Sequence, residues 1–585
     1  MAASEIDRNQ LEHSRYFVRG AFRRFYIPAM LSSFWLAVAG VADSVFVGNG
    51  IGSAGLAAIS FGQPVYLFYN ILSYGFSIGG SIHYAAKLAE GHVEEGNRIF
   101  MTILKLLIGI YVITAALGLV FLPHLMRLLG ADPMDAITRT YIRTQLVFVP
   151  VMFCQGPFYF FVNADNGPKT AAAALSLSGI IDTVFSYIFI IQMHLGVAGS
   201  VYSTVVGALV MLVIAGWHIL KKKGALRICR KKMDWAAAVL SARKGFATSL
   251  QYLYQFITMI AVNRLLMRIG GSVMVAAFDV VYNISLLCNS ISEGAVVATE
   301  PMISSYRSER NLDNIRSTLR LSFGWSSVFS LAFATVLALF SPWFSSLFGM
   351  SSGLELNYTS TGIRIFALSV LPAMINILFS GYYQAMLQEW LAYLITFLRS
   401  FVFYLTALFI CSRRGLEFFW YIFVMVELLT LTAWVPVSVL RGGILQLKGI
   451  DVSNVKTAVI DNNSKDINVI VQQIQEFCEE HGVGSRQAMY IGLTVEEICC
   501  AVIDRFREQL GKIYVQVTVV AEEEGLSLYL RDNAHEFNPL AEDTDRIRLE
   551  EGEYLELMGL RIVQSKAREF YYRRYSGFNT LVIRM

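Results

Sequence analysis

Long apolar stretches alternate with short polar loops from about residue 25 to residue 440. A helix needs about 20 mainly apolar residues to cross the ~30 Å hydrocarbon core of a bilayer. The pattern predicts twelve such helices, at about 25–48, 58–84, 100–122, 139–162, 170–192, 195–220, 246–269, 272–298, 317–340, 360–386, 390–412 and 415–440. We therefore expect an all-α polytopic membrane protein over most of the chain.

The pattern changes after about residue 452, where charged residues become frequent. Apolar residues at helical spacing predict helices at 466–481 and about 485–507, and a last helix is expected near 557–567. The stretch "KIYVQVTVVAEEEGLSLYLRD" predicts two strands joined at Gly525, and "EFYYRRYSGFNTLVIRM" predicts a hairpin about Gly577. Such an order is typical of a small α+β sandwich, with helices on one face of a sheet.

The resulting domain plan has five parts. We expect an N-terminal segment at 1–24, a six-helix lobe at 25–220, a basic linker at 221–245, a second six-helix lobe at 246–440, and a linker with the α+β domain at 441–585. The two lobes resemble each other. Ala57 and Ala58 align with Ala276 and Ala277, and Gly75 then aligns with Gly294. Two like halves are typical of a transporter whose lobes rock about a central cavity.

Loop charges predict the orientation, because Lys and Arg concentrate in cytoplasmic loops. The loops at 48–57 and 193–195 carry neither residue type. Both termini should therefore lie in the cytoplasm, with the spans in the cell membrane. The basic loops contain Lys221, Lys222, Lys223, Arg227, Arg230, Lys231, Lys232, Arg243 and Lys244, then Arg307, Arg310 and Arg316. We attribute them to topology and to contact with anionic lipids.

Composition agrees with this picture and excludes several classes of protein. Hydrophobic residues make up 55% and charged residues 16% of the chain, and the mean hydropathy is +0.51. The net charge of +4 gives no basis for nucleic-acid binding. The seven cysteines form no CxxC, so neither a disulfide framework nor a zinc site is expected.

Several motifs resemble the multidrug and toxic compound extrusion family. They are "PAMLSSFWLAVAGVADSVFVGNGIGSAGLAAIS" at 28–60, "VNADNGPKTAAA" at 162–173, "LGVAGSVYST" at 195–204, and "GYYQAMLQEW" followed by "FLRS" at 381–400. The resemblance covers about residues 20–440. It implies twelve helices in two lobes and export of bulky, often cationic or amphipathic organic compounds, drugs and other xenobiotics among them. The export would be coupled to inward H+ or Na+.

Acids inside membrane helices are candidate functional residues, because a buried charge in a bilayer is costly. Asp43 lies late in the first span, and Asp182 and Ser186 lie one turn apart in the fifth. Thr204 in the sixth span reaches a similar depth in the outer half of the membrane. Such an oxygen cluster suits a hard cation, or a proton on a buried carboxyl group.

The resemblance points to the same residues with one departure. One branch of the family has an aspartate, matching Asp43, an Asn-x-x-x-Asp pair and a threonine, matching Thr204. Here the pair is "DTVFS", so Asp182 replaces the asparagine and Ser186 replaces the aspartate. The other branch has acids at positions that match Gln255 and Gly381, so that site is absent.

Three further acids lie within the expected spans, namely Asp279, Glu293 and Glu427. Each could form a buried pair, for which Arg399 is the candidate partner, or could face an aqueous cavity. We include Asp279 among the candidate coupling residues.

The C-terminal domain resembles the ATPase domain of histidine kinases and anti-sigma factors. In "LTVEEICCAVIDRF" Glu496 matches the catalytic glutamate, but Cys500 stands at the magnesium-binding asparagine. Asp532 in "LRDNAHEFNPL" matches the adenine-reading aspartate, and Gly559 in "LMGLRIV" matches one phosphate-loop glycine. Other glycines of the pattern are absent. We expect a degenerate nucleotide site with weak ATP binding at most, no required cofactor and no ATP hydrolysis.

Three functions remain open from the sequence. The first is a bacterial antiporter with a regulatory domain that senses a ligand or docks a cytoplasmic regulatory protein. The second is a receptor or partner-switching signalling protein whose transporter-like part no longer transports. The third is a flippase for lipid-linked sugars. An ATP-driven pump is disfavoured, because the chain has no GxxxxGK[ST] loop.

Overall fold

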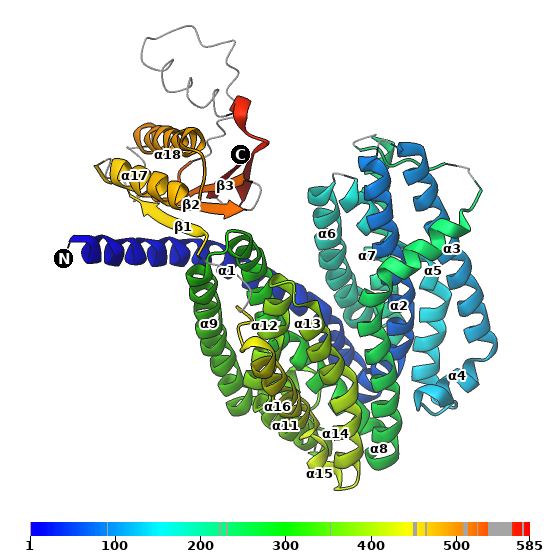
Figure 1. Ribbon diagram of the computed structural model, residues 1–585. Helices are drawn as coiled ribbons and strands as arrows, with labels where there is room; N and C mark the ends of the chain where they lie inside the picture. The colour runs from blue at the N-terminus through cyan, green and yellow to red at the C-terminus, as the bar shows by residue number, and fades with distance from the viewer. Residues whose placement is uncertain are drawn as a thin grey trace.

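The computed structural model describes residues 2–90, 92–165, 167–221, 224–229, 232–351, 353–447, 453–461, 465–506, 513–522, 525–535, 564–575 and 578–585. A long helical part is followed by a small domain of strands and helices, which we call the tail (residues 453–585; Figure 1). The helical part begins with α1 (Ala2–Ile51), α2 (Ser53–Ala89), α3 (Val93–Val120), α4 (Leu122–Leu129), α5 (Ala136–Ala164), α6 (Pro168–Ser186), the π-helix η1 (Tyr187–Gln192) and α7 (Val197–Leu220).

The second half of the helical part begins with α8 (Trp235–Ser308), in which two helices are joined across a kink at Gly271. Its further elements are α9 (Leu312–Leu339), α10 (Ser341–Leu347), α11 (Gly353–Ala367), α12 (Val370–Ala385), α13 (Glu389–Phe397), the π-helix η2 (Leu398–Val402), α14 (Phe403–Ser412), α15 (Leu416–Phe419) and α16 (Ile422–Gly442).

Many of these helices have the length and composition of membrane spans. Among the described residues nine helices are long and apolar enough, and the pair α11 and α12, bent by 52°, passes the same test together. One of the nine is the 60-residue stretch Ser249–Ser308 of α8. Its 60 residues are enough for two crossings, because one crossing takes about 20 residues. Its backbone breaks at Gly271, where φ is 68° and ψ is −164°.

The helices form two lobes that meet at one end of the molecule and diverge toward the tail (Figure 1). The N-terminal lobe contains α2 to α7, and the C-terminal lobe contains α9 to α16. At the far end Asn49 Nδ2 donates to Leu347 O at 2.7 Å, and Ser53 Oγ donates to Glu355 Oε1 at 2.5 Å. These hydrogen bonds join the lobes where they converge.

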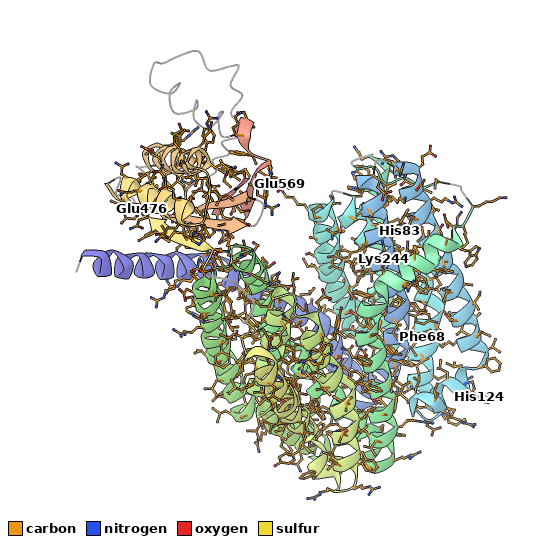
Figure 2. The ribbon with its side chains drawn as sticks, in the orientation of Figure 1. Phe68, His83, His124, Lys244, Glu476 and Glu569 are labelled. Atoms are coloured by element: carbon orange, nitrogen blue, oxygen red, sulfur yellow. The ribbon has the colours of Figure 1, made fainter. Side chains whose placement is uncertain are left out.

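Labelled side chains mark the two ends of the molecule in Figure 2. His83 and Lys244 lie at the end of the N-terminal lobe that is nearer to the tail, which carries Glu476 and Glu569. His124 lies at the opposite end. The basic region around Lys244 and the tail are therefore at the same end, which we call the tail-side end.

Helix α1 passes from one lobe to the other. Phe22 and Tyr26, in its first half, belong to an apolar cluster with residues of α8, α9 and α12. The Tyr26 hydroxyl lies 3.1 Å from Ser326 Oγ on α9. Val41 and Val47, in its second half, belong to the main apolar cluster with α2, α3 and α5. Helix α1 thus bridges the two lobes.

Helices α2 and α8 approach each other through glycines. A Cβ atom added to Gly79 would lie 1.8 Å from the carbonyl oxygen of Ser241, and one added to Gly245 would lie 1.7 Å from that of Gly75. Only glycine fits at such backbone contacts, which are frequent between membrane helices. The beginning of α8 is therefore held against the N-terminal lobe.

In its described residues the tail has a five-stranded antiparallel sheet, with helices α17 (Lys465–Glu480) and α18 (Ser485–Arg505) on one face. Its strands are β1 (Val455–Ile460), β2 (Val515–Glu522), β3 (Gly525–Asp532), β4 (Glu569–Tyr575) and β5 (Phe578–Arg584), in the spatial order β1-β2-β3-β5-β4. Both helices share an apolar core with the sheet. Helix α1 runs along the opposite side (Figure 1).

The sequence predicted most of these elements. Both tail helices, the β2–β3 pair and the β4–β5 hairpin are confirmed. Strand β1 was missed, and most of the helix expected near 557–567 lies outside the described residues.

Two element boundaries differ from the expected domain plan. Helix α1 already begins at Ala2, because its first half packs against the second lobe. Helix α8 already begins at Trp235, so the helix includes the end of the segment 221–245 that we expected to be a linker.

Candidate functional site

Asp43 on α1 is held by hydroxyl groups from two other helices. Ser186 Oγ on α6 donates to its Oδ1 at 2.8 Å, and Ser200 Oγ on α7 donates to its Oδ2. The hydroxyls of Ser186 and Ser203 lie 2.7 Å apart and extend the network. Ser186 is 1% exposed. The network therefore fixes the Asp43 carboxylate between three helices.

Asp182 lies one turn before Ser186 on α6. Helix α7 passes close by, since a Cβ atom added to Gly207 would lie 3.2 Å from the Cβ atom of Asp182. Its Oδ1 atom is buried and has no hydrogen-bond partner in the described part of the chain. A buried acceptor of this kind is costly unless it binds something, which makes Asp182 a candidate for proton or cation binding.

Asp279 brings a third carboxyl group from α8. Its Oδ2 accepts a hydrogen bond from Asn283 Nδ2 at 3.0 Å, and the same amide donates to Ser44 Oγ on α1 at 3.1 Å. Asp279 is only 3% exposed. Ser44 follows Asp43 in the sequence, so this contact links α8 to the Asp43 network.

A cavity of about 300 Å³ connects these groups. Its polar lining includes Asp43, Asp182, Thr204 and Asp279, so the structure brings four of the five expected residues together around one space. The fifth, Ser186, lies behind the wall and acts through its bond to Asp43. The other polar lining residues were not expected from the sequence; they are Ser44, Gln63, Tyr66, Tyr141, Gln145, Ser200, Tyr282 and Asn283.

The chemistry of this cavity is that of an oxygen-lined binding site. Its acids are joined by hydroxyl and amide groups, and its tyrosines offer both rings and hydroxyls. Within the described ranges no three His, Cys, Asp or Glu side chains come together as metal ligands. The cavity suits a proton or a weakly held hard cation at the carboxylates, beside an organic molecule against the rings.

A second cavity, of about 140 Å³, lies in the C-terminal lobe and carries a neutralised acid. Arg399 Nε donates to Glu427 Oε1 at 2.7 Å, and Asn376 Nδ2 donates to its Oε2 at 2.7 Å. The pairing of Glu427 with Arg399 is one of the two alternatives drawn from the sequence. Gln255 lines the same cavity, whereas Glu293 is exposed.

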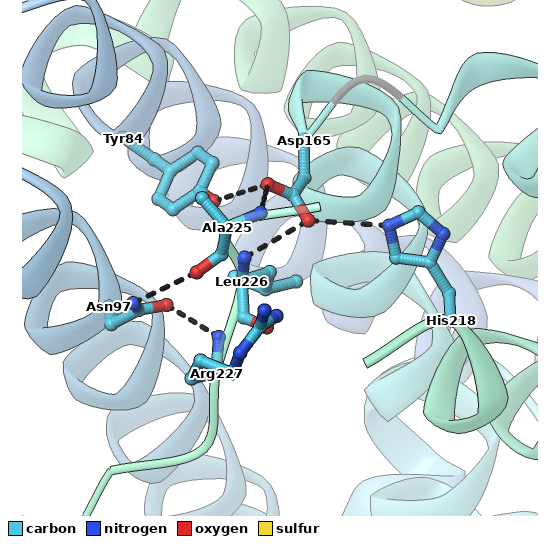
Figure 3. A network of polar contacts seen from close by, with 7 residues as sticks. All are labelled: Tyr84, Asn97, Asp165, His218, Ala225, Leu226 and Arg227. Carbon is cyan, nitrogen blue, oxygen red and sulfur yellow. Dashed lines mark hydrogen bonds and ion pairs between the residues drawn. The ribbon is translucent and has the colours of Figure 1, made fainter. Parts of the chain in front are cut away.

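Asp165, another buried carboxylate, was missed from the sequence (Figure 3). It is 1% exposed and accepts hydrogen bonds from Tyr84 Oη at 2.7 Å and from the backbone nitrogens of Ala225 and Leu226 at 2.7 and 3.0 Å. His218 Nε2 lies 3.2 Å from Oδ2, the oxygen that accepts from the Leu226 nitrogen. In the sequence, its position inside "VNADNGPKT" could have indicated Asp165 as a candidate residue. The role of Asp165 is to hold the segment after α7.

One of the expected nucleotide-site residues of the tail, Asp532, already forms hydrogen bonds within the protein. Asp532 ends β3 and accepts from Asn579 Nδ2 at 2.7 Å and from the Ala534 nitrogen at 3.0 Å. Glu496 is exposed on α18, and Cys500 is half-buried one turn further on. Gly559 lies outside the described residues.

Comparison with known proteins covers the helical part of the chain. A family model described as MatE matches residues 28–188 and 245–408, together more than half of the chain, and neither segment reaches the tail. The "Probable multidrug resistance protein YoeA" of Bacillus subtilis is 22% identical over 334 residues, which are 55% of this chain and 72% of that protein. A "FAD transporter" of Shewanella oneidensis is 22% identical over 337 residues, with the same two coverages.

Solved structures share the fold of the helical part. A structure described as the "Inward-facing conformation of a multidrug resistance MATE family transporter of the MOP superfamily" has a TM-score of 0.64 at 21% identity, covering 72% of this chain and 98% of that one. A MOP superfamily transporter from Pyrococcus furiosus has a TM-score of 0.56 at 21% identity, with coverages of 75% and 98%.

Proposed function

Because the chain belongs to the MatE family, we propose that it is a secondary active antiporter that exports amphipathic organic compounds, drugs among them, in exchange for H+ or Na+. Proteins of this family are transporters and not enzymes. The observation that carries the proposal is the cavity in which acids from α1, α6 and α8 meet tyrosine side chains. The cavity has room for neighbouring sites between the helices, one for a coupling ion and one for an organic substrate.

Coupling in this proposal rests on competition within the cavity. A proton or Na+ bound at Asp182 neutralises a carboxylate whose Oδ1 has no described partner. A cationic or amphipathic substrate is held by the rings of Tyr66, Tyr141 and Tyr282. It favours the state in which the carboxylates carry neither a proton nor Na+. Since each ligand disfavours the other, their fluxes run in opposite directions across the membrane.

The substrate class follows from the relatives and the cavity together. Relatives carry names such as multidrug resistance protein and multidrug and toxin extrusion protein, and one is named a FAD transporter. Aromatic side chains beside a few acids accept organic molecules of varied shape. We assign the chain bulky amphipathic compounds, including cations, and no nucleic acid.

The membrane topology in this proposal has twelve crossings. The 60-residue stretch of α8 counts twice, the bent pair α11 and α12 counts once, and the 37-residue helix α2 supplies the remaining one. Lys244 and the tail lie at the same end of the molecule, which supports a cytoplasmic tail and cytoplasmic termini. The surrounding lipid is that of the cell membrane.

The tail in this proposal is a regulatory domain of the histidine-kinase ATPase type that has lost catalysis. The sheet with α17 and α18 on one face supports this assignment. Cys500 replaces a magnesium ligand, and the Asp532 carboxylate already accepts two hydrogen bonds. A weakly bound nucleotide or a cytoplasmic protein are its candidate ligands.

The test is transport by purified protein in proteoliposomes under an imposed Na+ or H+ gradient, with a fluorescent cationic dye as substrate. We expect dye movement with one gradient and none without a gradient. Thr204→Val should reduce the flux, whereas Thr335→Val, at an exposed hydroxyl of α9, should not. Absence of dye movement with both gradients, together with specific capture of a cytoplasmic protein by the tail, would favour the signalling function instead.

A further inference from the structure

The tail is attached to the helical part through a buried ion pair. Arg531 on β3 points to the end of α8, where its Nη2 donates to Glu309 and to Ser305 Oγ at 2.6 Å. The side chains of Arg531 and Glu309 are only 12% and 3% exposed. The guanidinium group also lies over the Tyr306 ring, 5.1 Å from its centroid. Arg531 is therefore the polar anchor of the tail on α8.

A second anchor joins the tail to the first half of α1. The Phe578 ring on β5 lies 5.3 Å from the Phe17 ring and 6.3 Å from the Phe25 ring, centroid to centroid. The Arg24 guanidinium group lies over the same ring at 5.4 Å. Phe578 is 5% exposed and belongs to the same apolar cluster as residues of α1, α8, α9 and α12. A further contact joins β1 to the turn after α8, where Asn311 Nδ2 donates to Thr457 Oγ1 at 3.4 Å.

The two anchors belong to one rigid sheet. Strands β3 and β5 are paired, with Arg531 opposite Thr580, two residues from Phe578. The sheet therefore ties the first half of α1 to the end of α8. These are the two helices that carry Asp43 and Asp279 into the central cavity. Any movement of α1 relative to α8 at the tail-side end must strain or break one anchor.

Movement of this kind is required if the lobes alternate, because α1 bridges them. The first half of α1 is fixed to the second lobe by Tyr26 and Ser326, and its backbone at Met30 lies close to Gly294 of α8. Its second half carries Asp43 to the first lobe. If α1 (Ala2–Ile51) moves with the first lobe as one helix, closure of the tail-side end separates its first half from the end of α8. The docked tail opposes this separation, because it is anchored to both elements.

We propose that the tail is a lock on the transport cycle, which holds the lobes open at the tail-side end until it undocks. This inference rests on the proposed antiport function. The interface is not fully packed, because a cavity of about 350 Å³ remains between Tyr306 and Glu309 on one side and Tyr529, Arg531 and Phe578 on the other. Interfaces between domains of one chain commonly open and close in this way.

The lock can be tested by reversing each charge of the anchor in the full-length protein. Arg531→Glu or Glu309→Arg places two like charges in a buried contact, and the docking equilibrium should fall at least about tenfold. The double variant Arg531→Glu with Glu309→Arg restores opposite charges. Arg584→Glu is the matched control, since Arg584 pairs with Glu569 at an exposed position of the sheet.

Three measurements separate docking, conformation and transport. Docking is measured by hydrogen exchange of the peptides around residues 305–315 and 455–461. Opening of the far end is measured by maleimide labelling of Ser53→Cys, introduced in every variant at the contact with Glu355. Dye flux is measured in the same proteoliposomes. Both single variants should exchange faster, label faster and transport several times faster than the double variant and the control.

Each outcome has one meaning. Faster exchange with unchanged labelling would show that the tail undocks without releasing the lobes, and the lock would be wrong. Unchanged exchange in both single variants would also overturn it. Faster labelling with no dye flux in any variant would leave the lock standing and refute the proposed transport of such compounds.

Discussion

At the residue scale, the two carboxylates of the N-terminal lobe differ in how they are satisfied. Asp43 accepts hydroxyl hydrogen bonds from two neighbouring helices, whereas one oxygen of Asp182 is buried without a described partner. A charged group that is already solvated by protein hydroxyls binds a further ion less readily than an unsatisfied one. This difference supports the proposal that Asp182 is the main ion-binding residue and that Asp43 positions α6 and α7.

Neutralising these acids should abolish coupling without unfolding the protein. With Asp182→Asn we expect gradient-driven dye flux to fall to background, because an amide neither takes up a proton nor balances a cation. We expect the same of Asp43→Asn, because an amide has one acceptor oxygen and cannot accept from both Ser186 and Ser200. The measurement is flux in proteoliposomes, with thermal unfolding in detergent as the test of folding. Asp313→Asn is the control, because its side chain is 71% exposed at the beginning of α9. Wild-type flux from folded Asp182→Asn would refute this assignment.

The sequence identified the acids of the cavity but not their surroundings. Asp43, Asp182 and Thr204 could be found because acids are rare in membrane helices and the depths of the three residues agree. Gln63, Tyr66 and Tyr141 could not, because amides and tyrosines are common in membrane helices for ordinary packing reasons. The contact of Asn283 with Ser44 joins residues far apart in the chain, which no local pattern reveals.

At the element scale, the contact between helices α2 and α8 depends on glycines, which have no side chain. Gly79→Val should destabilise the protein by about 1–3 kcal/mol, because its Cβ atom would overlap the Ser241 carbonyl. The same substitution at Gly109 on α3, where no atom lies within 4 Å, should cost much less. The comparison is the thermal unfolding midpoint of both variants in the same detergent. Equal midpoints would mean that the helices separate easily at this contact.

The tail helices bury thiol groups, which gives the tail a pH dependence. Burial, with a smaller contribution from the charge of Glu479, raises the pKa of Cys478 on α17 from 9.0 to about 11. The unfolded chain therefore releases this proton first, and the free energy of unfolding of the tail should fall as the pH rises from 9 to 11. Burial raises the pKa of Cys499 on α18 as well.

This pH dependence can be measured in the full-length protein. Iodoacetamide labelling of Cys499 against urea concentration reports unfolding of the tail, and its midpoint should decrease between pH 9 and pH 11. The Cys478→Ala variant should show a smaller decrease. A midpoint that is constant over this range would contradict the proposed burial of the thiols.

Local patterns predicted the tail elements better than the ends of the long helices. The periodicities of α17, α18, β2 and β3 are clear because each has one apolar face. Strand β1 is short and is recognisable only through its pairing with β2. The first half of α1 is polar enough to be taken for a loop segment, and it is fixed by contacts with α8, α9 and the tail.

At the scale of the whole molecule, the repeated lobes were predictable and the docking of the tail was not. The repeat is visible in the sequence as two similar halves. The tail is attached by Arg531 and Phe578, which look like ordinary strand residues. Neither residue has a role in the resemblance to ATPase domains. Their importance comes from the face of the sheet that they occupy, opposite α17 and α18.

ATP turnover by the whole protein should be absent. Asp532 is bonded to Asn579, and the position of a magnesium-binding asparagine holds Cys500. We expect no Mg-dependent phosphate release above background from wild-type protein in liposomes, with or without dye. Turnover that disappears in Glu496→Ala would show that the tail has kept catalysis.

The segment between the lobes has a further consequence for how the halves are connected. Asp165 holds the backbone at Ala225 and Leu226, and Asn97 accepts from the Arg227 nitrogen at 2.6 Å (Figure 3). The Asp234 nitrogen donates to Thr102 Oγ1 at 3.1 Å. Both ends of the segment are thus fastened to the same lobe. The described residues of the segment extend the first lobe, which places bending further along the chain, within α8. A cut between residues 227 and 234 would leave both fragments held in place, and the two halves could function as a non-covalent pair.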